Sequence, residues 1–333
     1  MKQRLFGPRK TGVSAIGIGG MSFSDFYGPT NTEQSHAILR AALDLGINHI
    51  DTANGYGSGV SEERIGSFLK KQGPGRHSLF KIATKAGIRR DSDGRRHFDN
   101  SSAHLATELD KSLQRLGVEQ VELFYVHRRD ENHSIEEVTD ILAGFVKTGK
   151  IRQFGFSEIA PTSLARAATV HPVGAVQSEY SLSTRFPELG LVQKTAELGT
   201  SLVTFSPVGR SLLTDTPHSR EKAKISPFLK NNPRFIEPNL SRNIDATSGF
   251  RRLAGNLGVK TSSLAIAWLL HQGQHILPIP GTRSTDHLRE LAQGVDLTLS
   301  PADLDEINNE LPVGWAHGDR YSVDQWVGPE KYC

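Results

Sequence analysis

Strand-like and helix-like segments alternate along almost the whole of this chain. Eight short apolar segments have the character of buried strands, at 13–19, 47–50, 80–85, 121–126, 151–157, 175–180, 201–206 and 275–279. Helix-like segments separate them, and no linker-like stretch divides the chain in the middle. Strands that alternate with helices indicate a parallel sheet. Eight such units predict an α/β fold whose sheet closes on itself, a (β/α)8 or TIM barrel.

The length of the chain fits one such barrel. A (β/α)8 barrel uses about 250 residues or more, so we expect residues 1–333 to form a single domain. Gln3 to Phe6 and the region around Gly12 predict an N-terminal β-hairpin that closes the barrel bottom. Long loops are expected at the C-terminal face, namely a polar loop at 87–100 with four arginines and a stretch at about 213–245 with four prolines. Long loops in compact domains are usually functional.

Composition and motifs exclude several classes of protein. The net charge is only +3 and no run of five Lys or Arg occurs, so nucleic-acid binding is not predicted. The only cysteine is Cys333, which allows no intramolecular disulfide and fits a reducing cytoplasm. No signal peptide and no apolar stretch of about 18 residues is found. The GxGxxG, Walker and HExxH patterns are absent. We expect a cytoplasmic enzyme without a metal site and without a doubly wound dinucleotide fold.

Chemically active side chains stand where three consecutive predicted strands end. Asp51 follows the second strand and Tyr56 lies in the loop beyond it, while Lys85 and His127 end the next two strands. In a parallel barrel the C-terminal ends of the strands face the active site. Buried lysines are rare unless paired, so Lys85 needs a partner such as Asp51. The alternative is a purely structural Asp–Lys pair beside an uninvolved tyrosine and histidine.

These four residues resemble the catalytic tetrad of the aldo-keto reductase superfamily. The segments DTANGYG at 51–57, IATK at 82–85 and LFYVHR at 123–128 are similar, in order and context, to signatures of that family, including its bacterial NADPH-dependent members. The resemblance extends from about Arg4 to about Tyr321. It implies a (β/α)8 barrel, a nicotinamide cofactor, and catalysis by Asp51, Tyr56, Lys85 and His127.

The chemistry of the tetrad supports carbonyl reduction. A phenol with a pKa near 10 is a weak acid at neutral pH, and a nearby ammonium such as Lys85 stabilises its phenolate. We expect Tyr56 to donate a proton to a carbonyl oxygen that His127 orients. Positioned acid–base catalysis contributes about 10²–10⁴-fold. None of these side chains can supply a hydride, so a nicotinamide must do so.

The resemblance also implies a cofactor-binding surface on the later strand ends. Glu158 and Gln177 would hold the nicotinamide carboxamide, Phe205 would stack on the ring, and the loops at 206–212 and 279–284 would hold the pyrophosphate and adenosine phosphate. The expected cofactor residues are Gly20, Met21, Asp51, Ser157, Glu158, Gln177, Phe205, Ser206, Pro207, Val208, Gly209, Arg210, Ser211, Ile279, Gly281, Thr282, Arg283, His287 and Glu290.

This chain departs from the common family pattern at four positions of this predicted surface. Glu158 and Leu291 stand where many members have asparagine, Ser211 replaces a glycine, and His287 replaces an arginine. Arg283 has no acidic neighbour before Asp286. Because a 2′-phosphate needs a permanently charged planar donor, we predict that the cofactor is NADP(H).

The substrate pocket is predicted less sharply. We expect Phe23, Phe26, Tyr27, His127 and Arg128 to line it, together with the loop at 89–98 and the aromatic C-terminal tail, although each loop residue could equally be a packing residue. The predicted function is NADPH-dependent reduction of an aldehyde or ketone, which is a small-molecule substrate. Two alternatives are oxidation of a sugar or pyridoxal-type alcohol and, with less support, a cofactor-sensing role like that of channel β subunits.

Overall fold

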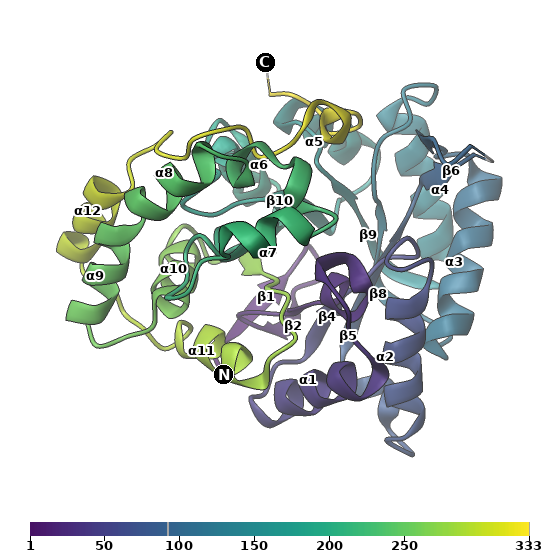
Figure 1. Ribbon diagram of the computed structural model, residues 1–333. Coiled ribbons are helices and arrows are strands. Elements are labelled where there is room, and N and C mark those ends of the chain that lie inside the picture. Colours follow the sequence, from purple (N-terminus) through teal and green to yellow (C-terminus); the bar gives the residue numbers. More distant parts are fainter. Residues whose placement is uncertain (92, 333) are drawn as a thin grey trace.

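Eight parallel strands form the centre of the computed structural model, which describes residues 1–91 and 93–332 (Figure 1). Cys333, the only cysteine of the sequence, lies outside the described residues. Backbone hydrogen bonds from Gly17 N to Pro278 O (2.9 Å) and from Gly19 N to Pro280 O (3.0 Å) join the first strand to the last. The predicted (β/α)8 fold is confirmed. In order around the sheet the strands are β3 (Ile18–Gly19), β4 (His49–Asp51), β5 (Lys81–Ala86), β8 (Val121–Val126), β9 (Ile151–Ser157), β10 (Ala175–Glu179), β11 (Ser201–Phe205) and β12 (Ile276–Pro278).

Helices surround these strands. Three of them begin with the capping boxes that the sequence contains, in which a side chain at Asn31, Ser134 or Ser300 accepts from the backbone three residues later. The helices that follow the strands are α1 (Thr32–Asp44), α2 (Val60–Lys70), α3 (Ser102–Leu116), α4 (Ile135–Lys147), α5 (Pro161–Val170), α6 (Leu191–Glu197), α10 (Thr261–His271) and α11 (Thr285–Gln293), and α12 (Pro301–Glu310) packs outside them.

The first predicted strand was too long. Val13 and Ser14 do not belong to the barrel, because they pair with Arg4 and Gln3 in an antiparallel hairpin of β1 (Gln3–Phe6) and β2 (Thr11–Ser14). Only Ile18–Gly19 pairs in parallel with β4. An apolar run cannot by itself distinguish a hairpin strand from a barrel strand when the two are continuous in sequence.

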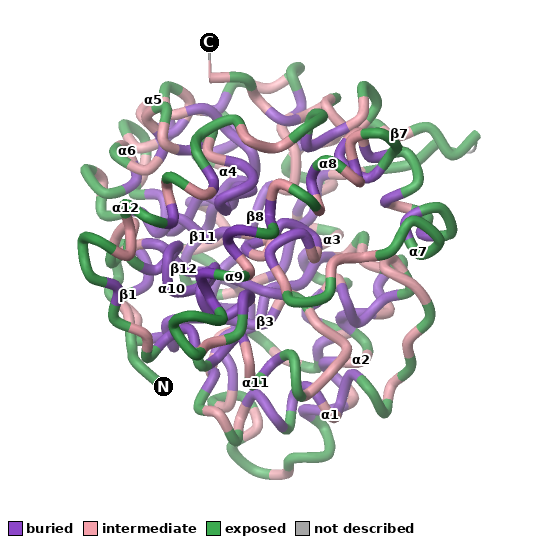
Figure 2. Tube along the Cα trace, turned by 60° about the vertical axis from the view of Figure 1, so that its left-hand side comes forward, coloured by how far each residue is buried: buried purple, intermediate pink, exposed green. Residues whose placement is uncertain are grey.

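The hairpin closes the bottom of the barrel, as predicted. Phe6 and Val13 pack into the interior cluster with Leu123, Val203 and other inward-facing strand residues. The Arg4 guanidinium donates to backbone carbonyls before and within β12, at 2.6–2.7 Å. A second, larger core lies between the strands and the helices. In Figure 2 the buried strands β3, β8, β11 and β12 lie at the centre, and the exposed segments lie around them.

Both predicted long loops contain secondary structure. The polar loop at 87–100 includes an antiparallel hairpin of β6 (Ile88–Arg90) and β7 (Arg96–Phe98). The stretch at 213–245 includes α7 (Arg220–Ile225) and most of α8 (Asn239–Ala246), and α9 (Ser248–Asn256) follows it. Within the described residues no single helix is long and apolar enough to cross a membrane, although the bent pair Asn239–Asn256 and Thr261–His271 passes that test of length and composition together.

Candidate active site

Four side chains from three neighbouring strands meet at the C-terminal end of the barrel. Asp51 ends β4, Tyr56 lies in the following loop, Lys85 lies in β5, and His127 directly follows β8. Lys85 Nζ forms an ion pair with Asp51 Oδ1 and donates to Thr52 O (2.8 Å) and Tyr56 Oη (3.2 Å). The rings of Tyr56 and His127 meet edge to face, with centroids 5.8 Å apart. The structure therefore brings the four expected catalytic residues together.

The ion pair in this cluster is almost completely buried. The Lys85 side chain is 0% exposed and that of Asp51 is 4% exposed. A buried charge is stable only when it is paired and its hydrogen bonds are made, and the ammonium of Lys85 has three acceptors. The second carboxylate oxygen of Asp51, Oδ2, accepts a 2.7 Å hydrogen bond from Gln177 Nε2. Gln177, which the sequence suggested only as a cofactor contact, thus also holds Asp51.

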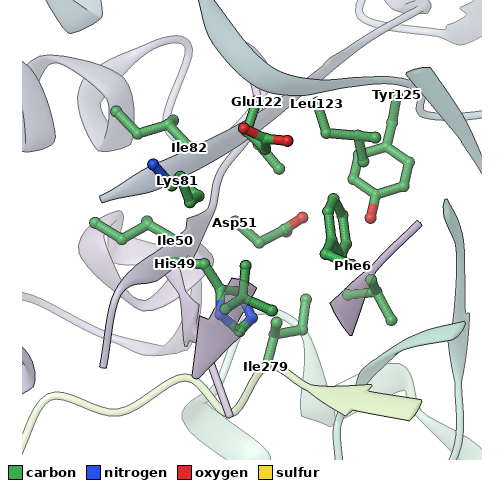
Figure 3. A pocket seen from close by; sticks show the side chains of 13 residues that line it. Phe6, His49, Ile50, Asp51, Lys81, Ile82, Glu122, Leu123, Tyr125 and Ile279 are labelled. Carbon is green, nitrogen blue, oxygen red and sulfur yellow. The ribbon is translucent and has the colours of Figure 1, made fainter. Parts of the chain in front are cut away.

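A small cavity lies on the hairpin side of Asp51. Its volume is about 20 Å³, which is close to the space that one water molecule needs. Figure 3 shows the Asp51 carboxylate pointing toward Phe6 and Tyr125 in this cavity. The Tyr125 hydroxyl is buried and has no hydrogen-bond partner among the described residues. This cavity therefore lies in the barrel interior behind the tetrad, away from the side on which Tyr56 and His127 stand.

The protonation states of the cluster suit a proton donor. Burial lowers the pKa of Lys85, but Asp51 and Tyr56 raise it by more, so the ammonium stays charged at neutral pH. Burial raises the pKa of Tyr56, and the charge of Lys85 lowers it by less. Burial, with the charges of Arg128 and Lys85, holds the pKa of His127 well below its usual range. At neutral pH the cluster therefore presents a protonated phenol and an uncharged imidazole.

Glu158 is engaged within the protein. It directly follows β9 in the left-handed backbone region, with φ of 59°. Its carboxylate forms a buried ion pair with Arg320 of the C-terminal tail and accepts from Ser178 Oγ (3.1 Å) and Glu179 N (2.9 Å). Burial raises the pKa of Glu158, but the charge and hydrogen bond of Arg320, with the charge of Arg128 and the hydrogen bond from Glu179 N, together lower it by more, so the net shift is downward. Its expected contact with a carboxamide would therefore compete with these partners.

A second buried carboxylate, Glu179 at the end of β10, was missed by the sequence interpretation. Arg210 donates to it from Nη1 (3.0 Å) and Nη2 (2.5 Å), and Arg234 and Arg320 lie 3.7 and 3.9 Å away. The guanidinium of Arg210, which we expected over a pyrophosphate, is thus directed at Glu179. An acidic residue at a strand end was the signal used for Asp51, and it could have identified Glu179 as well.

The loop after β11 has an unusual backbone. Ser206, Gly209, Arg210 and Ser211 all have positive φ, at 52°, 57°, 52° and 89°. Such conformations cost non-glycine residues about 1–3 kcal/mol each and cluster at functional sites. The hydroxyl of Ser211 accepts a 2.9 Å hydrogen bond from the backbone N of His218. The expected loop residues Pro207 and Val208 lie between these turns, and Phe205, half-buried, precedes them.

The loops after the first and last strands are in contact. Gly20 and Met21 begin the short helix η1 (Gly20–Phe23). A Cβ on Gly281 would lie 3.1 Å from Gly19 O, so a side chain there would force the two loops apart. Ser22 Oγ also donates to Thr282 O at 3.1 Å. The expected cofactor residues from both ends of the chain thus form one continuous rim.

A cluster of basic residues lies beyond this rim. Arg283 Nη1 donates to Pro29 O at 3.0 Å, and its charge reaches Lys222 and His218 of the long stretch after β11. Burial, followed by Lys222 and Arg283, lowers the pKa of His218 to about 4. Neither Arg283 nor Lys222 forms an ion pair with a carboxylate in the described part of the chain. The sequence predicted a role for Arg283, but it did not indicate that Lys222 and His218 act on the same site.

The remaining expected residues occupy different environments. His287 is exposed and Glu290 half-buried on α11, while Ile279 is buried in the barrel interior. Phe23 is buried in the main core, which is the packing alternative that the sequence left open. The rings of Phe26 and Tyr27 pack against Phe228, the first tilted with centroids 4.8 Å apart and the second edge to face at 6.0 Å. Ser157 and Arg128 are hydrogen-bonded to each other at 3.1 Å.

The C-terminal tail crosses the C-terminal end of the barrel, where Figure 1 shows it in yellow beside α5. Arg320 lies over the rings of Tyr321 and Trp326, 4.6 and 4.7 Å from their centroids. Glu330 Oε2 accepts from Ala160 N at 2.8 Å. These contacts fasten the aromatic tail, which was expected near the substrate pocket, to the ends of β9 and β10.

Comparison with known proteins agrees with this arrangement. The model of the Aldo/keto reductase family matches residues 15–310. The chain is 36% identical over 313 residues to aldo-keto reductase yakc [NADP(+)] of Schizosaccharomyces pombe, covering 93% of this chain and 92% of that protein. It is 34% identical over 327 residues to probable aldo-keto reductase 1 of Glycine max, covering 96% and 93%.

Solved structures give the same result for the fold. The glycerol dehydrogenase AKR11B4 from Gluconobacter oxydans superposes with a TM-score of 0.81 at 25% sequence identity, covering 93% of this chain and 94% of that one. The similarity therefore extends over most of the chain.

Proposed function

This chain belongs to the aldo/keto reductase family, and on that premise we propose that it reduces an aldehyde or ketone to an alcohol with NADPH. As a family member it is an oxidoreductase of carbonyl compounds or alcohols. One observation carries the finer proposal. A single buried ammonium, Lys85 Nζ, contacts both Asp51 and the hydroxyl of Tyr56, which lies 3.2 Å away. Through that contact, the positive charge of Lys85 stabilises the phenolate that Tyr56 becomes when it donates its proton.

In this proposal Tyr56 donates its proton to the carbonyl oxygen as that oxygen gains negative charge. Lys85 stabilises the phenolate that remains, and Asp51 holds Lys85 charged and oriented. His127 is uncharged and donates a hydrogen bond that orients the carbonyl. Charge that develops in a site closed to water is stabilised by such fixed donors more than it would be in water. A bound NADPH supplies the hydride.

The donors around the rim fit NADPH. A 2′-phosphate would lie against Arg283 and Lys222, since the charge of Arg283 acts on Lys222 and neither has a carboxylate partner among the described residues. Two like charges that repel each other favour an anion between them. Ser157 Oγ and Gln177 would hold the carboxamide, since the carboxylate of Glu158 is paired with Arg320. The name of the yeast relative, which includes NADP(+), supports the same cofactor.

A second candidate is the reverse reaction, oxidation of an alcohol, in which Tyr56 would accept the proton. The structural relative from Gluconobacter is named a glycerol dehydrogenase, which favours testing polyols as well as aldehydes. A cofactor-sensing protein like the channel β subunits would turn over simple aldehydes slowly and would retain a partner in a pull-down.

The test is Tyr56→Phe, assayed on a panel of aldehydes, ketones, sugars and polyols with both cofactors in both directions. We expect cofactor affinity to be unchanged and kcat to fall by about 10²–10⁴-fold, which is the contribution of positioned acid–base catalysis. A rate within a few-fold of the parent would show that another group is the acid. Absence of turnover by the parent on the whole panel would refute the proposed function.

A further inference from the structure

We propose that Arg128 is a carboxylate-binding residue beside the reacting carbonyl, so that the preferred substrates are aldehydes or ketones that carry a carboxylate. This inference rests on the proposed function, because it names the substrate class of the same site. Arg128 directly follows His127 at the end of β8. Its positive charge acts on both His127 and Tyr56, so a group bound to Arg128 lies within electrostatic reach of the proposed acid.

One edge of the Arg128 guanidinium is uncommitted. Nη1 donates to His127 O (2.7 Å) and to Ser157 Oγ (3.1 Å). Nε is buried and has no hydrogen-bond partner, and Nη2 makes no hydrogen bond to the described residues. Nε and Nη2 together form the edge of two parallel N–H groups that a carboxylate binds in bidentate fashion. A buried donor without an acceptor is costly, and a bound carboxylate would satisfy this one.

The protein holds Arg128 in a fixed position. Asn100, which is fully buried, donates from Nδ2 to Arg128 O at 3.1 Å. The aliphatic part of the side chain packs under the tail at Gly328, where an added Cβ would lie 3.2 Å from Arg128 Cδ. Gly328 has φ of 106°, a conformation that favours glycine. A guanidinium that is held in advance loses less conformational entropy when it binds an anion.

The charge around Arg128 is not balanced by the protein. No carboxylate within the described ranges forms an ion pair with it. Glu158, whose pKa the charge of Arg128 helps to lower, is already paired with Arg320. Arg96 of β7 adds a second positive charge nearby, and Arg96 itself donates to backbone carbonyls of the tail rather than to an acid. An anion supplied by the substrate would neutralise this local excess.

The experiment compares two aldehydes that differ only in the anion, a carboxybenzaldehyde and its methyl ester. For each, kcat/KM is measured with NADPH in the parent, in Arg128→Gln and in Arg128→Lys. We expect the parent to prefer the carboxylate by about ten- to a hundredfold, the effect of a hydrogen bond to a charged group. Arg128→Gln should bring the ratio of the two values close to one, and Arg128→Lys should retain part of it because it keeps the charge but loses the planar fork.

A matched control removes the same charge elsewhere. Arg152 lies in β9 near its N-terminal end, and its side chain is 53% exposed, so Arg152→Gln should leave the ratio unchanged. Calorimetric titration of benzoate into the enzyme with NADP+ gives a reading that is independent of turnover. We expect benzoate binding to weaken by the same factor in Arg128→Gln, with NADP+ affinity unaltered.

Three results would overturn the inference. The first is a parent enzyme that prefers the methyl ester, and the second is a ratio of the two kcat/KM values that Arg128→Gln leaves unchanged. The third is a loss of NADP+ affinity in Arg128→Gln as large as the loss of benzoate affinity, because that result would assign the guanidinium to the cofactor. If the parent turned over neither these aldehydes nor any member of the substrate panel, the proposed reductase function would be refuted instead, and the benzoate titration would still decide the role of Arg128.

Discussion

Replacing Lys85 by methionine tests the tetrad most directly, because methionine keeps an apolar side chain of similar length and removes only the ammonium. In the parent the ammonium has three acceptors, Asp51 Oδ1, Thr52 O and Tyr56 Oη. After the change, Asp51 keeps only its 2.7 Å hydrogen bond from Gln177. A buried carboxylate would therefore remain without a counter-charge.

The expected loss of stability follows from this burial. Removing one partner of a buried ion pair typically costs about 3–5 kcal/mol, out of a total unfolding free energy of about 5–15 kcal/mol. The variant should fold, but with a large part of its stability lost. Turnover should fall by about 10²–10⁴-fold, since Lys85 is the main group that opposes the effect of burial on the pKa of Tyr56.

The loss should depend on pH in a defined direction. Burial already raises the pKa of Asp51 in the parent, although the charge of Lys85 opposes this. In the variant that opposing charge is gone, so the folded-state pKa of Asp51 rises further above its unfolded value of about 3.9. The stability of the variant is therefore greatest at low pH and is lost as pH rises. In the parent the pKa of Lys85 is raised, and its contribution is complete below its unfolded value of about 10.4. The difference between parent and variant should therefore be smaller near pH 5.5 than near pH 8.

Urea unfolding at these two pH values, monitored by tryptophan fluorescence, measures this difference. The control is the double variant Asp51→Asn, Lys85→Met, which removes both charges. It should regain most of the stability, because replacing a whole buried pair is often neutral, but it should stay inactive. A single variant less than about 1 kcal/mol below the parent, or a double variant as unstable as the single one, would refute the idea that burial of an unpaired Asp51 sets the cost.

Three further outcomes are expected. Arg283→Ala should weaken NADPH binding about ten- to a hundredfold and leave NADH binding nearly unchanged. The control is Arg289→Ala, which should change the binding of neither cofactor, because Arg289 is an exposed arginine of α11 paired with Asp286. Equal losses for both cofactors would contradict the proposed 2′-phosphate site. Glu158→Gln should expose the tail to proteolysis, because it leaves the buried Arg320 without its main partner; an unchanged cleavage rate would show that the tail is held by other contacts. Burial lowers the pKa of His49 to about 4, below its unfolded value of about 6.5. The free energy of unfolding should therefore fall by about 1.4 kcal/mol for each pH unit as pH decreases between these two values. Urea titrations of His49→Gln should lack this dependence on pH.

The sequence by itself determined the fold and the catalytic cluster. Alternation of strands and helices is a local pattern, and the rules for short, right-handed connections leave few topologies other than a parallel barrel for it. In such a barrel the ends of neighbouring strands must lie on one rim, so Asp51, Lys85 and His127 had to meet once their strands were recognised. The chemistry of each side chain then restricted the reactions that this cluster could catalyse. Capping boxes such as that at Ser134 were readable for the same reason, since both partners are three residues apart.

The tertiary structure decided which charges pair. Glu158 and Arg320 are 162 residues apart, and no periodicity in the sequence links a strand end to a tail. The same holds for the approach of Lys222 to Arg283, and for the division of residues 13–19 between a hairpin and a barrel strand. Whether a donor such as Arg128 Nε is satisfied depends on every group packed around it, including the tail. Ion pairs and hydrogen bonds between distant segments form only after the chain has closed long loops, so their partners are set by the packed fold and not by neighbours in sequence.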